Sequence, residues 1–324
     1  MTDHFGTFEH ADHATARREH GYCADDVARV LLVTTREHQP SALVRELTDG
    51  ALNFLDEAVD ETGQCRNRRS ADGHWTSGPS VDDCWGRSVW GLGSAAASEH
   101  EGVALAARVV FERAAQRRSP WSRSTAFAVL GAAALAQREP DHRLALDLLR
   151  DAALSMKRGA NDPTWPWPES HLTYANAVLP DAMMATGASL DRPDLVERGL
   201  VLLHWLIKRE SLDGHLSVTP VGGSESKDFA PRFDQQPIEI STLADACARA
   251  TTLDDSATWP RTIHLAEDWF DGRNDAGVTM WDPHTGGAFD GLGPDAANRN
   301  QGAESTLALI STRQQARRND GAIA

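Results

Sequence analysis

The strongest constraint in the sequence is a regular alternation between two kinds of helical segment. Six segments are apolar or built of small residues on most sides, and they begin near residues 25, 82, 122, 173, 238 and 303. A helix that is apolar on most sides is buried, whereas a helix with one apolar stripe covers a core. The pattern predicts an all-α protein. Five amphipathic segments of the covering kind alternate with the buried ones, at 42–60, 102–117, 143–157, 195–210 and 257–272.

The number of buried segments favours one arrangement of these helices. The buried segments recur every 40 to 65 residues without literal identity between units, and the variation falls in the loops. Helix pairs of this kind form either an open solenoid or a closed ring. Six inner helices close a ring, so we predict an (α/α)6 barrel, with 1–324 as one domain. We expect residues 1–20 to pack on the barrel as a polar segment and residues 318–324 to form a disordered tail.

The charge balance and the cysteines limit the possible partners. The net charge is −15, from 47 acidic and 32 basic residues, which repels phosphate backbones and makes nucleic acid an unexpected partner. No stretch approaches the roughly 20 apolar residues of a membrane span, and the polar N-terminus has no signal-peptide core. The four cysteines form no C-x-x-C pair, and the histidines near the N-terminus lack companion metal ligands. We therefore expect a soluble, reduced, cytoplasmic protein without a metal or other cofactor.

Polar and aromatic residues gather directly before the buried helices. In an (α/α)6 barrel all inner helices run in the same direction, so these six segments would meet at one end. Helix N-termini expose free backbone N–H groups and a positive dipole end, which favour carboxylates and can donate to hydroxyl groups. We therefore expect one funnel-shaped site, lined by the segments that precede the buried helices.

Two Asp-Asp pairs stand before the first two buried helices. Asp25 and Asp26 are either a helix cap and its neighbour, worth about 1 kcal/mol, or carboxylates that face a ligand. Asp82 and Asp83 repeat the arrangement before the second helix. Arg87 follows about one turn later on the same face, where it can pair with an aspartate. Such a pair is either scaffolding or a clamp on a polar ligand.

The loop before the fourth buried helix reads "NDPTWPWPESHLTY". Pro166 and Pro168 make the loop extended and stiff. The faces of Trp165 and Trp167 suit stacking on sugar rings, although they can instead pack the loop onto the core. A glutamate beside two tryptophans has a desolvated carboxyl, and the expected rise in its pKa suits Glu169 to general acid catalysis.

The segments before the last two buried helices are rich in side-chain amides. "RFDQQPIE" places Pro237 in the first turn of a helix, and Glu239 there either caps its own helix or faces a ligand. Amides supply both donors and acceptors, as sugar hydroxyls require. In "NQGAEST", Glu304 lies near a helix N-terminus that stabilises an ionised carboxylate. This position favours Glu304 as a base or as a group that orients a ligand.

These motifs together are similar to a known bacterial domain. "GYCADDVARVLL", "DDCWGRSVWGLG", "WPWPESHLTYANAVLPDAM", "RFDQQPIE" and "NQGAEST" resemble the six-hairpin glycosidase-like domain that occurs alone or C-terminal to retaining glycosyltransferases. The resemblance extends from Thr2 to Thr306 and implies carbohydrate metabolism in a bacterium. Where the family usually reads "GYCTDDNARAL", Ala24 and Val27 replace the threonine and the asparagine, which removes one polar contact. "FDQQP" also resembles the sugar 2-epimerases of this barrel fold, whose paired catalytic histidines are not evident here.

We predict a glycoside hydrolase that acts on an oligosaccharide or intracellular glycan with paired carboxylates, with inversion as the favoured course. The first alternative is a non-catalytic glycan-binding module that works with a glycosyltransferase. The second is a sugar epimerase or isomerase, with His171 as the base. The predicted catalytic residues are Glu169 as acid and, as base, Asp25, Asp26, Asp83 or Glu304. The predicted substrate-binding residues are Tyr22, Asp82, Trp85, Arg87, Trp165, Trp167, His171, Tyr174, Asn176, Arg232, Asp234, Gln235, Gln236, Glu239, Asn300 and Gln301.

Overall fold

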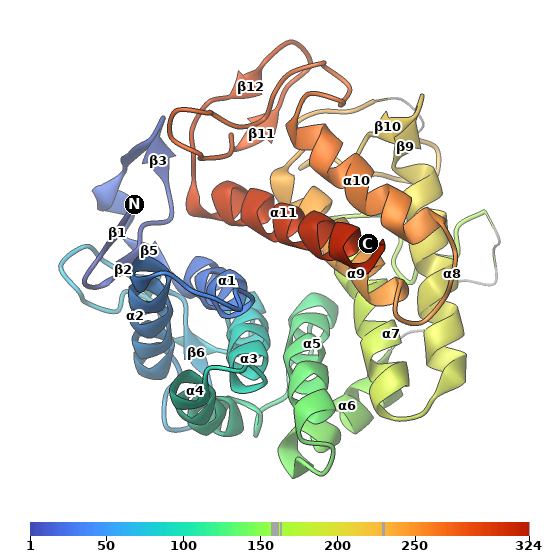
Figure 1. Ribbon diagram of the computed structural model, residues 1–324. Helices are drawn as coiled ribbons and strands as arrows, with labels where there is room; N and C mark the ends of the chain where they lie inside the picture. The colour runs from blue at the N-terminus through green and yellow to red at the C-terminus, as the bar shows by residue number, and fades with distance from the viewer. Residues whose placement is uncertain (157–161, 163, 229–230, 324) are drawn as a thin grey trace. The chain divides into compact units, whose positions relative to one another are not determined.

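The computed structural model describes residues 1–156, 162, 164–228 and 231–323. In this part of the chain, helices dominate and the strands are very short (Figure 1). Each predicted helical segment is present, which confirms the all-α class. The helices are α1 (Ala24–Thr35), α2 (Ala42–Ala58), α3 (Asp83–Ala96), α4 (Glu101–Ala114), α5 (Ser122–Arg138), α6 (Arg143–Ser155), α7 (Val178–Ser189), α8 (Pro193–Arg209), α9 (Pro237–Ala250), α10 (Thr258–Phe270) and α11 (Ala303–Ile323).

The fourth buried helix begins later than predicted. We expected it near residue 173, whereas α7 starts at Val178. The side chain of Asn176 accepts a hydrogen bond from the backbone N–H of Thr173 at 3.0 Å, and this contact holds a turn in front of the helix. Lys157, the predicted end of the third amphipathic helix, lies outside the described residues.

The last helix is longer than predicted. α11 continues to Ile323, whereas we expected a disordered tail from residue 318. In its last turns, the side-chain amide of Asn319 lies 3.0 Å from the ring nitrogen of His264 in α10, so the helix end has a packing partner. Ala324 lies outside the described residues. None of the helices in the described residues is both long and apolar enough to cross a lipid bilayer.

The strands are two residues long, and they shape the loops rather than a core. Antiparallel pairs join β1 to β2, β5 to β7, β6 to β8, β9 to β10 and β11 to β12. The N-terminal strands pack on α1 and α2, where the ring of Phe8 stacks on Tyr22 at 4.5 Å. A short 3-10 helix (Arg18–His20) leads into β5. The strands are β1 (Thr2–Asp3), β2 (Gly6–Thr7), β3 (Ala11–Asp12), β4 (Thr15–Ala16), β5 (Tyr22–Cys23), β6 (Cys65–Arg66), β7 (Arg68–Arg69), β8 (Pro79–Ser80), β9 (Ser211–Leu212), β10 (His215–Leu216), β11 (Gly291–Leu292) and β12 (Ala297–Asn298).

Burial alternates along the chain as the sequence pattern predicts. The helices α1, α3, α5, α7, α9 and α11 are buried on most sides, and the five helices between them bury one stripe each. In α3, every residue from Cys84 to Gly93 is buried. In α4, burial is confined to Ala107, Val110, Phe111 and Ala114, which lie on one face.

The chain divides into two compact units, and each is considered by itself. The first comprises residues 1–11, 15–155 and 185–193, and the second residues 12–14, 156–184 and 194–324. In the first unit, α3 packs against both α1 and α5. Glycines allow this approach, because a Cβ atom on Gly93 would lie 2.3 Å from the backbone oxygen of Gly131. A Cβ atom on Gly86 would likewise lie 2.2 Å from the backbone oxygen of Ser124, near the N-terminal turn of α3 that carries several predicted site residues.

In the second unit, α9 packs against α10 and α11 (Figure 1, orange to red). Asp245 of α9 joins two of these helices, since its carboxylate accepts hydrogen bonds from Ser311 at 3.2 Å and from the amide of Gln315. Trp269 and Phe270, at the end of α10, are fully buried. This packing sets the N-terminal turns of α9 and α11, which carry Glu239 and Glu304.

Candidate functional site

The two aspartates at the start of α1 have different surroundings. Neither is the N-cap, because that position belongs to Cys23. Asp26 is 2% exposed and accepts a hydrogen bond from Arg29 at 2.5 Å. The thiol of Cys23 donates to its second oxygen at 3.3 Å. Asp26 is therefore held by its own helix, and Asp25 is the aspartate of this pair that faces other elements.

Asp25 forms a buried ion pair with α3. Its Oδ1 lies 3.2 Å from Nε of Arg87, whose guanidinium carbon is 4.0 Å from the ring centroid of Phe127. Burial raises the pKa of Asp25, and the charges of Arg87 and Arg29 oppose the rise, while that of Asp83 adds to it. The pair joins the N-terminal turns of α1 and α3. The spacing of Arg87 predicts a partner among the two aspartates at the start of its own helix, whereas Asp25 comes from a different helix.

Two other predicted residues of the first unit have packing partners. Tyr22 is fully buried, and its hydroxyl donates to the carboxylate of Asp3 at 2.9 Å. Trp85 is 1% exposed, and its indole N–H donates to the backbone oxygen of Ala114 at 3.1 Å. These two side chains support the core and do not present a face to solvent.

An aromatic residue outside the predicted set lies beside α3. Trp121 is 59% exposed, and its indole N–H donates to Oδ1 of Asp82 at 3.0 Å. Asp82 is the N-cap of α3, although its side chain makes no capping bond. Asp83 is half-buried in the first turn. Trp121 could have been found in the sequence by the same rule as the others, since it directly precedes the third buried helix.

Glu239 closes the turn in front of α7 rather than capping its own helix. Its carboxylate is 4% exposed and accepts from the backbone N–H groups of Ala175 at 2.5 Å and Asn176 at 3.1 Å. The side-chain amide of Asn176 adds a third bond at 3.3 Å. Ala175 has φ +46°, a conformation that needs such support in a residue other than glycine. Both predicted residues therefore hold the backbone that leads into α7.

The two tryptophans of the "WPWPES" loop pack onto α8. Trp167 is 1% exposed and stacks on Trp205 at 5.8 Å, and Trp165 is 8% exposed and meets the same ring edge-on at 5.2 Å. The indole N–H of Trp165 also donates to the backbone oxygen of Glu169 at 2.8 Å. The loop-packing alternative thus accounts for both rings. Glu169 is half-buried on this loop, beside the exposed His171.

Gln235 joins the segment before α9 to the loop before α11. It is fully buried, and its amide N–H donates to Oδ2 of Asp275 at 2.5 Å. Its backbone pairs with that of Leu292 in both directions, at 3.1 and 2.8 Å. This pairing carries the neighbouring Asp234 next to Gly291, where a Cβ atom would lie 2.3 Å from Oδ1 of Asp234.

Two carboxyl groups of the second unit act on a third; Asp234, Asp290 and Glu304 are called the carboxyl cluster below. Asp290 accepts a hydrogen bond from the backbone N–H of Gly302 at 2.7 Å. Burial raises its pKa, and the charges of Glu304 and Asp234 raise it further. Partial desolvation also raises the pKa of Asp234, although the residue is exposed. The structure thus brings two predicted residues together around a third.

Asp290 was missed in the sequence because it does not precede a helix directly. It lies in "FDGLG", twelve residues before Gly302, and folding of the β11–β12 hairpin brings it back to the start of α11. The glycines near Asp290 are the feature of the sequence that could have indicated its position. A Cβ atom on Gly302 would lie 2.8 Å from Oδ1 of Asp290, so a residue without a side chain is required at that contact.

The remaining predicted residues support the loops around this cluster or lie in the open. Asn300 accepts from the backbone N–H of His13 at 3.1 Å, and Gln301 accepts from the hydroxyl of Thr285 at 2.6 Å. Arg232 is exposed and pairs with Asp228. The other two positions are the half-buried Gln236 and Tyr174, which is 43% exposed.

One group of side chains in the first unit has the composition of a metal site. Ligand atoms of Glu9, Cys23 and Asp26 lie within 4.8 Å of one another. Both carboxylates are already paired with arginines, Glu9 with Arg68 and Asp26 with Arg29. The arginine charges compensate the carboxylates, so the group has the character of an ion-pair cluster.

Comparison with known proteins identifies the fold. The sequence matches no protein-family model and no curated protein. The structure is similar to a sugar epimerase from a ruminal bacterium (TM-score 0.70, 10% identity, 97% of this chain and 93% of the other). It is also similar to cellobiose 2-epimerase from Bacillus thermoamylovorans (0.69, 11%, 99% and 94%) and to the GH76 alpha-mannanase from Bacteroides thetaiotaomicron (0.61, 10%, 93% and 87%). These likenesses show that the chain has the (α/α)6 barrel fold, as the sequence predicts.

Proposed function

We propose that this protein is an enzyme that hydrolyses a glycosidic bond, and that the carboxyl cluster carries the reaction. The observation behind the proposal is that neighbouring carboxyl groups have different environments. The pKa of Asp290 is raised by burial and by two nearby carboxylates, whereas Glu304 lies in the first turn of α11. Pairs of carboxyl groups with pKa values pushed apart are what acid and base catalysis require.

In this proposal Asp290 is the general acid and Glu304 is the general base. Its raised pKa suits Asp290 to donating a proton to the glycosidic oxygen as the bond to the leaving sugar breaks. Glu304, in the first turn of α11, takes a proton from water. The water oxygen then bonds to the anomeric carbon, so one water is consumed and two sugars are released.

Asp234 and Glu169 have supporting roles in the proposal. The negative charge of Asp234 helps to raise the pKa of Asp290. The carboxylate oxygens of Asp234 can also accept hydrogen bonds from sugar hydroxyls. Glu169 remains a candidate acid on the loop before α7. In the first unit, Asp25, Asp83 and Arg87 are candidate ligand-binding groups on the N-terminal turns of α1 and α3.

Isosteric variants test this assignment. Purified Asp290→Asn and Glu304→Gln are incubated with mannan, cello-oligosaccharides and malto-oligosaccharides, and released reducing ends are measured. We expect each variant to lose about 100-fold or more in kcat on the glycan that the native protein cleaves. Asp295→Asn is the matched control, because Asp295 is an exposed carboxylate on the same hairpin. Full activity in Asp290→Asn would overturn the role of Asp290, and no cleavage of any glycan would overturn hydrolysis.

Sugar epimerisation or isomerisation is the second candidate, because two of the three similar structures named above are sugar epimerases. It requires a base that removes a proton next to a carbonyl. The product then has the mass of the substrate, and deuterium from heavy water enters at the carbon that loses its proton. His171, the predicted base, is exposed and lies 3.0 Å from the hydroxyl of Ser170. Mass and NMR analysis of the same reactions separates this outcome from hydrolysis.

A non-catalytic glycan-binding role makes a third, distinct prediction. The carboxylates would then act only as hydrogen-bond acceptors, and a partner glycosyltransferase would supply the chemistry. Binding of a glycan without any change in it, unaffected by Glu169→Gln, is the result that supports this alternative.

A further inference from the structure

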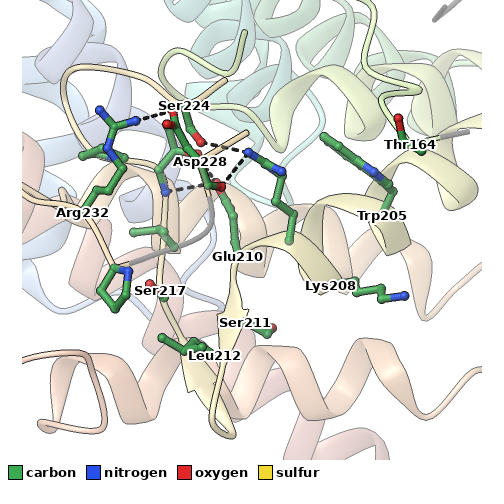
Figure 2. Close-up of a pocket in the computed structure, with 15 residues that line it drawn as sticks. Thr164, Trp205, Lys208, Glu210, Ser211, Leu212, Ser217, Ser224, Asp228 and Arg232 are labelled. Atoms are coloured by element: carbon green, nitrogen blue, oxygen red, sulfur yellow. Dashed lines mark hydrogen bonds and ion pairs between the residues drawn. The ribbon is translucent and has the colours of Figure 1, made fainter. Parts of the chain in front are cut away.

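A pocket of about 440 Å³ lies at the C-terminal end of α8 in the second unit (Figure 2). Its volume is in the range of about 300–1,000 Å³ that is typical of small-molecule sites. Of the predicted site residues, only Arg232 lines it, and the carboxyl cluster contributes nothing to its walls. The pocket is therefore a separate feature that the proposed reaction does not use.

Glu210 places a carboxyl group with an unused oxygen in this pocket. The side chain is 3% exposed. Oε1 accepts two hydrogen bonds from Thr219, one from the backbone N–H at 3.1 Å and one from the hydroxyl at 2.5 Å. Among the described residues, Oε2 has no hydrogen-bond partner. A carboxylate oxygen without a protein donor takes its hydrogen bonds from water or from a ligand, and a ligand hydroxyl can supply one.

The charges around Glu210 are balanced. Arg232 pairs with the carboxylate of Asp228, and Arg209 donates to the hydroxyl of Ser224 at 3.2 Å. Figure 2 shows this network converging beside Glu210, while the side chain of Lys208 extends away from it. Two guanidinium groups thus face two carboxylates, an arrangement that suits an uncharged ligand rather than an anion.

The rest of the lining is mixed in polarity. Trp205, Leu212 and Val218 supply apolar surface, and Ser211 and Ser217 supply hydroxyl groups. A sugar ring combines the same two kinds of surface, because its face carries apolar C–H groups and its edge carries hydroxyl groups. We propose that this pocket is a second saccharide site, which binds an uncharged mono- or disaccharide through Oε2 of Glu210 and the side of Trp205.

The proposal predicts a pH dependence of binding. Burial raises the pKa of Glu210 to about 7. The other charged groups that line the pocket are Lys208, Arg209, Asp228 and Arg232, and no histidine is among its described lining residues. The ionised carboxylate accepts a hydrogen bond from a sugar hydroxyl, and the proton competes with that bond. We therefore expect affinity to fall by about tenfold between pH 8 and pH 6.

Calorimetric titration of the whole chain tests the site, with glucose, mannose, cellobiose and mannobiose as ligands at pH 6, 7 and 8. Glu210→Gln keeps an oxygen for Thr219, so we expect it to fold, to bind more weakly at pH 8 and to lose the pH dependence. Trp205→Phe should weaken binding while preserving most of the ring packing. Glu197→Gln is the matched control, because Glu197 is exposed on the same helix, and it should bind as the native protein does.

Other arms of the experiment separate this site from the proposed reaction. Binding should persist in an Asp290→Asn/Glu304→Gln double variant, and its loss there would place the sugar at the carboxyl cluster and overturn the proposal. Tighter binding of glucuronate or glucose 6-phosphate than of the neutral sugars would overturn the uncharged class of ligand. Absence of binding by all four neutral sugars, or binding that Glu210→Gln leaves unchanged, would also overturn it.

Discussion

Oδ1 of Asp25 lies 3.2 Å from Nε of Arg87, and this buried ion pair joins the first turns of α1 and α3. The pair occupies the segments that the sequence singled out as two Asp-Asp motifs. It shows that one member of such a motif can tie two helices together. The other member, Asp26, is bound within its own helix by Arg29. Asp25 therefore connects two helices, whereas Asp26 stabilises the first turn of its own helix.

Breaking this pair from the arginine side should be strongly destabilising. In Arg87→Leu, Asp25 keeps its charge in a buried site without its main partner, and we expect a loss of about 3–5 kcal/mol in the free energy of unfolding. Urea denaturation measures the loss. The double variant Asp25→Asn/Arg87→Leu should recover part of it, because no charge is left uncompensated. A single variant as stable as the native protein would show that the pair does not hold the two turns together.

Removal of the Glu239 carboxylate should loosen the turn before α7. Glu239→Ala leaves the backbone N–H groups of Ala175 and Asn176 without their acceptor, and we expect a cost of about 3 kcal/mol. Denaturant unfolding measures the stability, and hydrogen exchange at these two amides locates the effect. Glu197→Ala, on the exposed side of α8, should change neither quantity. Unchanged protection of the two amides would contradict the bonding described above.

The buried Glu210 should make stability depend on pH in a defined window. Its pKa rises from 4.5 to about 7 on folding. Because the folded state binds the proton more tightly, this contribution is fully present below pH 4.5 and is lost as pH rises to 7, by up to about 3 kcal/mol. The free energy of unfolding of the native protein, minus that of Glu210→Gln, should fall across this window and level off above it. A difference that stays constant from pH 5 to pH 8 would contradict the raised pKa.

The glycines beside the carboxyl cluster should be sensitive to a single methyl group. In Gly291→Ala the new Cβ would lie 2.3 Å from Oδ1 of Asp234, so the carboxylate must move. We expect a cost of about 1–3 kcal/mol in stability, together with a loss of activity on the substrate found for the native protein. Gly222→Ala is the control, since nothing lies within 4 Å of a Cβ atom there. Equal behaviour of the two variants would show that the position of Asp234 does not matter.

The helices of this protein could be predicted closely, because their signal is local. Whether a segment is apolar on most sides or along one stripe is visible in the segment itself, and that property decided burial in α3 and α4 as predicted. The start of α7 was predicted too early because a contact distant in sequence, rather than a local pattern, decides it. Residues 173–176 continue the helical pattern, and Glu239, more than sixty residues away, holds them in a turn.

The sequence alone determined the all-α class, the alternation of buried and covering helices, and the polar segments in front of the buried ones. Only the tertiary structure decided what each polar side chain does. Gln235 reaches Asp275, and Trp167 meets Trp205 rather than solvent. Asp290 lies close enough to Glu304 for the charge of Glu304 to raise its pKa, although no helix directly follows Asp290. Hydrophobic periodicity is a property of neighbours in sequence, whereas the task of a carboxylate depends on the donors, charges and desolvation that distant segments bring to it.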